Sequence, residues 1–159
     1  MNTGFRFSAV VAVILASVIA GGCSTTAITG AAITYSYEPR ANFAEFKTYR
    51  WAEAGQAYGR DTLLEANVRF LADRQLEAKG LALKADQADL LVWIGNELDT
   101  SSYSYGYGYE LRKLTLNISR ADNKQLVWRG NASGAIKTDA ASGDLRNAVE
   151  GMLANFPPR

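Results

Sequence analysis

Five short stretches of the chain have the hydrophobic patterns of β-strands. Residues 33–37 and 111–119 alternate apolar with polar residues, as expected for strands with one buried face, and residues 47–51 and 125–135 are also strand-like. The third in order is apolar at consecutive positions, which predicts a central strand covered on both faces. A polar turn at residues 121–124 separates the last two, which are therefore expected to form a hairpin. The stretches are residues 33–37, 47–51, 90–95, 111–119 and 125–135.

Between Thr62 and Gly80 the apolar residues follow the spacing of an amphipathic helix. Thr62 and Glu65 match a capping box at its start, and Gly80 is suited to a left-handed cap at its end. The predicted buried face consists of Leu64, Val68, Leu71, Ala72 and Leu76. The charged residues are expected to form a solvated face, which consists of Glu65, Arg69, Asp73, Arg74, Glu77 and Lys79.

A second helix is predicted near the carboxyl terminus, opened by Ser142 or Asp144 and ended by Pro157. Its buried face consists of Leu145, Ala148, Val149, Met152, Leu153 and Phe156. Long helices inserted among hairpin-connected strands indicate the α+β class. We therefore expect residues 33–159 to form a single domain, a mostly antiparallel sheet of about five strands with two amphipathic helices packed on one face.

The amino terminus has the organisation of an export signal. Residues 7–20 carry no charge and follow Arg6, but they are too few for a spanning helix of about 20 residues. Small residues then lead to Cys23, the single cysteine of the chain. This resembles a lipoprotein signal, which implies removal of residues 1–22, acylation of Cys23 and a flexible tether over residues 23–32. The alternatives are a secretory signal in which Cys23 is incidental, or an uncleaved anchor.

Acylation would attach the protein to a membrane, because two or more acyl chains hold a protein far more firmly than one. Ser24 occupies the position at which an Asp is the familiar signal for retention in the inner membrane. In a cell with two membranes the resemblance therefore implies the periplasmic face of the outer membrane.

Composition excludes several functional classes. The 17 Lys and Arg nearly balance the 16 Asp and Glu, and no basic block occurs, which argues against a nucleic-acid partner. The absence of histidine removes the commonest general base and the usual zinc ligand. Gly106 and Gly108 lack the context of a phosphate-binding loop. No cofactor, metal site or catalytic residue is predicted.

Two carboxylate pairs are the remaining candidates for catalysis, since glycoside hydrolysis uses paired acids. Asp86 and Asp89 come just before a strand, where turn formation and capping explain them better. Glu97 and Asp99 would share one face of an extended strand, and a solvated edge accounts for them equally well. We therefore expect a protein that is not an enzyme.

Tyrosines are concentrated in one short segment. In an extended conformation the four rings would lie on one face, where they could stack on sugars or on an apolar partner, with Trp93 or Trp128 nearby. A hairpin tip or a mobile Gly/Tyr loop is the simpler interpretation. The four residues, a candidate binding surface, are Tyr103, Tyr105, Tyr107 and Tyr109.

Several short signatures in order resemble a bacterial lipoprotein family known as domain of unknown function 4136. The resemblance implies a small lipid-anchored envelope domain and supplies no activity and no catalytic residues. We expect a non-enzymatic module that binds an envelope protein or assists assembly, with glycan or small-ligand binding by the tyrosines as the alternative and a carboxylate-dependent hydrolase as a third. The signatures are residues 35–39, 42–43, 46–51, 79–81, 89–90, 126–130 and 156–158.

Overall fold

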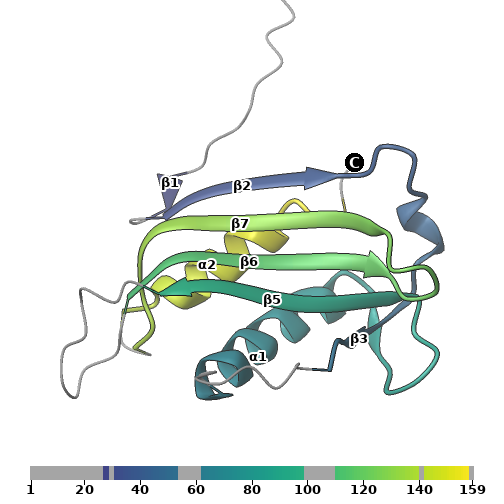
Figure 1. The fold of residues 1–159 in the computed structure, drawn as a ribbon, viewed down its shortest axis with the longest axis horizontal. Helices are drawn as coiled ribbons and strands as arrows, with labels where there is room; N and C mark the ends of the chain where they lie inside the picture. Colours follow the sequence, from purple (N-terminus) through teal and green to yellow (C-terminus); the bar gives the residue numbers. More distant parts are fainter. Residues whose placement is uncertain (1–26, 29–30, 54–61, 99–109, 140–141, 158–159) are drawn as a thin grey trace, which may run out of the picture.

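The computed structural model describes residues 27–28, 31–53, 62–98, 110–139 and 142–157, which form one sheet and two α-helices (Figure 1). The helices are α1 (Thr62–Ala78) and α2 (Asp144–Leu153), with a 3-10 turn η1 (Phe43–Glu45). The strands are β1 (Ala27–Ile28), β2 (Ala31–Tyr37), β3 (Thr48–Trp51), β4 (Ala82–Leu83), β5 (Leu90–Leu98), β6 (Glu110–Arg120) and β7 (Leu126–Lys137).

The middle of the sheet is antiparallel, and the strand order is β1-β2-β7-β6-β5-β3-β4. β6 and β7 are hydrogen-bonded neighbours joined by a turn in which Lys124 takes a left-handed φ of 61°, so the predicted hairpin is confirmed. β2 and β5 pair antiparallel on either side of this hairpin. The α+β class is therefore confirmed.

The predicted strand count and strand directions need correction. The described residues form seven strands, and β3 runs parallel to both β4 and β5. β1 and β4 have two residues each, which is too short for an alternating pattern to show in the sequence. The parallel edge arises because α1 connects β3 to β4 and returns the chain to the same end of the sheet.

Both helices lie behind the sheet in the view of Figure 1 and cover the same face. α2 packs on β7 and β2, and α1 packs against α2. The predicted apolar face of α2 is buried throughout, and that of α1 is buried except at Leu71, which is partly exposed. Gly80 has a φ of 86°, which confirms the left-handed cap after α1.

The opposite face of the sheet has no helix on it within the described ranges, so the prediction that residues 90–95 are covered on both faces is wrong in part. Leu90 and Val92 belong to the core beneath the helices. Trp93 and Gly95 alternate with them and therefore lie on the other face, where both are partly exposed.

Candidate functional site

The lipid-attachment site and the tyrosine binding surface predicted from the sequence both fall outside the described residues. Cys23 lies in the amino-terminal range that is not described, and the four tyrosines of residues 103–109 lie between β5 and β6. Lipid attachment and a tyrosine binding surface therefore stay predictions. Neither α1 nor α2 has the length and hydropathy of a membrane-spanning helix.

Asp89 closes the junction between β3 and β5. Its Oδ2 accepts hydrogen bonds from the backbone N–H of Lys47 and of Thr48, both at 2.9 Å, and from the Thr48 hydroxyl at 2.8 Å. The Asp89 N–H donates in return to the Thr48 hydroxyl at 3.0 Å. The bond from the Lys47 amide is the main cause that lowers the pKa of Asp89. Asp89 is therefore a structural residue, but it joins two segments that are 41 and 42 residues apart, so the predicted local turn or cap is wrong.

The other acidic residues considered for catalysis give no described pair. Asp86 is exposed, and the carboxylate of Asp89 is occupied by its backbone and hydroxyl donors. Asp99 and the side chain of Glu97 lie outside the described structure. Within the described ranges, no three potential metal-ligating groups come together.

Part of the predicted solvated face of α1 instead fastens the helix to β3. Asp73 Oδ1 accepts from the Tyr49 hydroxyl at 2.7 Å and from Trp51 Nε1 at 2.9 Å. Arg69 lies 5.1 Å from the Trp51 ring centroid and pairs with Glu65 at 3.0 Å. Burial and the neighbouring Asp73 raise the pKa of the Tyr49 hydroxyl. These groups position α1, and the prediction that Arg69 and Asp73 are simply solvated is wrong.

Trp93 and Trp128, both considered as partners of the tyrosines, have different surroundings. Trp128 is fully buried, and its ring meets Phe156 edge-on with centroids 5.5 Å apart. It therefore belongs to the core and cannot contact a ligand at the surface. Trp93 lies on the helix-free face and is partly exposed.

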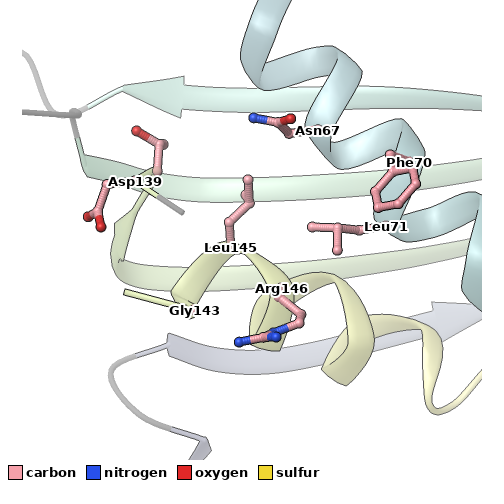
Figure 2. A pocket seen from close by; sticks show the side chains of 8 residues that line it. Asn67, Phe70, Leu71, Asp139, Gly143, Leu145 and Arg146 are labelled. Carbon is pink, nitrogen blue, oxygen red and sulfur yellow. The ribbon is translucent and has the colours of Figure 1, made fainter. Parts of the chain in front are cut away.

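A cavity of about 220 Å³ opens between α1 and the start of α2 (Figure 2). Leu71 of α1 and Leu145 of α2 supply apolar walls, and Phe70 stands beside them. Polar groups complete the lining at Asn67, Thr138, Asp139 and Arg146, together with Gly143. The cavity thus combines an apolar interior with hydrogen-bonding groups of both charges.

Exposed apolar side chains of α1 occur near this cavity. Phe70 is 62% exposed and Leu63 is 70% exposed, although both are large hydrophobic residues. They are seven residues apart and therefore lie on one side of the helix. The sequence contained this signal, because Leu63 and Phe70 are the large apolar residues of α1 outside its predicted buried face. What it could not show was the position of α2 beside them.

A second exposed aromatic group lies at the end of β2. Tyr35 and Tyr37 are 43% and 42% exposed, and their rings stack with centroids 6.4 Å apart. The Tyr37 ring also has an edge-on contact with Phe43, and Phe43 in turn contacts Phe156 of the core. This group packs against the core through Phe43, and the cavity between the helices remains the better candidate site.

Comparisons with known proteins identify relatives of the fold. The family model described as domain of unknown function (DUF4136) matches residues 33–158. No curated protein matches the chain.

Three solved structures share the fold at low sequence identity. A DUF4136 family protein from Bacteroides thetaiotaomicron is 16% identical with a TM-score of 0.61, over 80% of this chain and 96% of that one. The PelC dodecamer from Paraburkholderia phytofirmans is 14% identical with a TM-score of 0.55, over 81% and 99%. A PDZ domain protein from Parabacteroides distasonis is 12% identical with a TM-score of 0.59. The match covers 80% of this chain but only 35% of that protein.

Proposed function

The chain belongs to the DUF4136 family, and we propose that it is a lipid-anchored, non-enzymatic domain of the cell envelope that binds a partner protein. The family has no known function, so the proposal rests on features of this chain. The observation that carries it is the cavity between α1 and α2 with the exposed Phe70 at its side. An exposed aromatic residue next to an apolar hollow is typical of the centre of a protein interface.

The size of the cavity favours a side chain of a partner over a free small molecule. Pockets for small ligands commonly have volumes of about 300–1,000 Å³, whereas this one has about 220 Å³. An apolar side chain would contact Leu71 and Leu145, and polar groups around it would meet Asp139 and Arg146. Such a mixture of apolar centre and polar rim is the usual composition of an interface.

The amino-terminal sequence supports the anchor and the location. The uncharged residues 7–20 and the small residues before Cys23 fit a processed signal, with acylation at Cys23. Residues 27–28 and 31–32 belong to β1 and β2, so the tether would be shorter than the expected residues 23–32 and would hold the domain close to the periplasmic face of the outer membrane. A partner in the same compartment would then meet the domain at a raised local concentration.

Two further observations bear on the kind of partner. PelC, one of the fold neighbours, is described as a dodecamer, which favours testing copies of this chain as the partner. The spacing of Tyr103, Tyr105, Tyr107 and Tyr109 supports glycan or small-ligand binding as a second candidate function. A hydrolase acting through carboxylates has no described residue pair in its favour.

Replacing Phe70 by Glu tests the interface. The new carboxylate lies four residues before Arg74, an arrangement that supports a helix, so α1 should still form. We expect the Phe70→Glu variant, expressed at the natural level, to lose at least about tenfold of any specifically co-purified protein, the effect of removing one interface anchor. The matched control is Leu83→Glu, since Leu83 is 50% exposed on β4. Equal recovery of the partner with both variants would contradict the proposal.

A further inference from the structure

The helix-free face of the sheet is turned toward the viewer in Figure 1. The strand register places a set of polar side chains on this face. Residues opposite each other in neighbouring strands share a face and lie about 5 Å apart. The register therefore aligns two rows across β2, β7, β6 and β5. The first row is Ser36, Arg129, Asn117 and Trp93, and the second is Thr34, Asn131, Thr115 and Gly95.

Hydrogen bonds between side chains hold both rows in place. Arg129 Nε donates to Asn117 Oδ1 at 2.7 Å, which orients the guanidinium across the face. The Thr115 hydroxyl donates to Asn131 Oδ1 at 3.0 Å. Because the Asn131 oxygen accepts this bond, its amide nitrogen is left to donate elsewhere. Asn117 itself is buried, whereas Arg129 is exposed and Asn131 is partly exposed. The guanidinium of Arg129 and the amide of Asn131 are thus preorganised donors, which lowers the entropy lost when a ligand binds.

Trp93 provides an aromatic surface at one end of the first row. It is partly exposed, and Gly95 follows it on the same face without a side chain beyond Cα. A Cβ at Gly95 would meet its nearest atom, Thr115 Cβ, at 3.7 Å. The surface next to the indole therefore has room for a ligand. The C–H groups of a sugar ring fit against an indole, and its hydroxyl and acidic groups would reach the adjacent Asn, Thr and Arg side chains.

The charges of the face favour an anion. Arg129 lies within the first row, and Arg50 of β3 lies on the same face because it pairs with Leu91. Neither row contains a carboxylate. Beyond the rows, Glu97 of β5 and Glu110 of β6 each stand opposite a lysine of the neighbouring strand. Two arginines beside amide and hydroxyl groups match a ligand that carries negative charge and many acceptors.

We propose that this face binds a glycan strand bearing carboxylate groups, with Trp93 as the stacking surface and Arg129 as the cationic contact. The inference goes beyond the partner-binding function, because the helices and their cavity lie on the other side of the sheet. One site can therefore be occupied, or absent, independently of the other.

The test is affinity electrophoresis of the full chain, purified in detergent, through gels containing polygalacturonate. Dextran serves as the neutral polysaccharide and polyglutamate as a polyanion without sugar rings. We expect retardation by polygalacturonate alone, weakened by added salt. The Trp93→Ala and Arg129→Gln variants should each raise the apparent Kd about tenfold, corresponding to ~1.4 kcal/mol.

Matched variants separate the glycan site from general charge and from misfolding. Arg74→Gln removes an exposed arginine from α1 and should leave retardation unchanged. Trp93→Phe keeps an aromatic ring and should retain part of the binding if the ring acts by stacking. Phe70→Glu should bind as the wild type does, even where it loses the partner protein. Equal retardation by polyglutamate, unchanged binding of Trp93→Ala, or an equal loss in Arg74→Gln would overturn the proposal.

Discussion

The packing of Trp128 shows how one small residue permits the largest side chain of the core. Trp128 and Gly130 are two residues apart on β7 and therefore point to the same face. A Cβ added at Gly130 would collide with the Trp128 ring and come within 3.0 Å of Met152 Cβ. The indole thus occupies the space that a side chain at position 130 would need. Gly130 pairs regularly with Tyr35 and Leu116, so β7 continues through this position without a bulge.

Gly130→Ala is expected to destabilise the domain by about 1–3 kcal/mol, the usual cost of adding a methyl group to a filled core. The free energy of unfolding in urea measures this effect. Gly95→Ala is the control, since its Cβ would meet nothing nearer than 3.7 Å, and its change should be within about 1 kcal/mol in either direction. A Gly130→Ala protein as stable as the wild type would show that the indole does not lie over this position.

At the scale of elements, the connection between β3 and its neighbours depends on polar groups that look like ordinary surface residues in the sequence. Asp73 joins α1 to β3 through Tyr49 and Trp51. Asp89 joins the loop before β5 to the start of β3. The helical pattern predicted where α1 begins and ends, but periodicity describes hydrophobic burial and gives no partner for a carboxylate. That is why both contacts needed the tertiary structure.

Asp89 gives a stability difference that depends on pH. Its folded pKa is lowered below the unfolded value of about 3.9, so its contribution is complete above that value and is lost as the pH falls through the folded pKa. At about pH 7 we expect Asp89→Asn to lower the free energy of unfolding by about 1 kcal/mol, the scale of one lost hydrogen bond. As the pH falls below the unfolded value and through the lower folded pKa, the difference from the wild type should shrink.

Asp86→Asn is the control for this pH series, because Asp86 is an exposed carboxylate three residues away. Denaturant unfolding of the three proteins across the acidic range gives the comparison. If the difference between Asp89→Asn and the wild type stays constant from neutral to acidic pH, the charge of Asp89 does not stabilise the junction between β3 and β5.

At the scale of the whole molecule, the sequence predicts the order of elements better than their arrangement. The hydrophobic patterns of α2, β6 and β7 are long enough to be recognised in the sequence, and the structure confirms these three elements. The sheet order was beyond prediction, because two-residue strands carry no pattern and the parallel edge depends on the crossover through α1. The cavity was also beyond prediction, since Leu71 and Leu145 come from elements distant in the sequence.

The sequence also did not show that the two faces of the sheet have different surroundings. From the sequence, the apolar run containing Trp93 indicated burial on both faces. Within the described residues, the structure places helices on one face only (Figure 1). The register places the two rows, which include Trp93, on the other face. A protein held by its amino terminus could therefore present a partner site and a glycan site at once, on opposite sides of one sheet.

Photo-crosslinking in intact cells from a benzoylphenylalanine probe at position 70, with the same probe at position 83 as the control, tests directly whether the cavity beside Phe70 binds a protein. Phe70 and Leu83 are both large and at least half exposed, and only Phe70 lines the cavity. We expect a discrete protein adduct from position 70, recovered with the outer-membrane fraction, and none from position 83. Absence of an adduct at position 70, or the same adducts from both positions, would contradict the proposal.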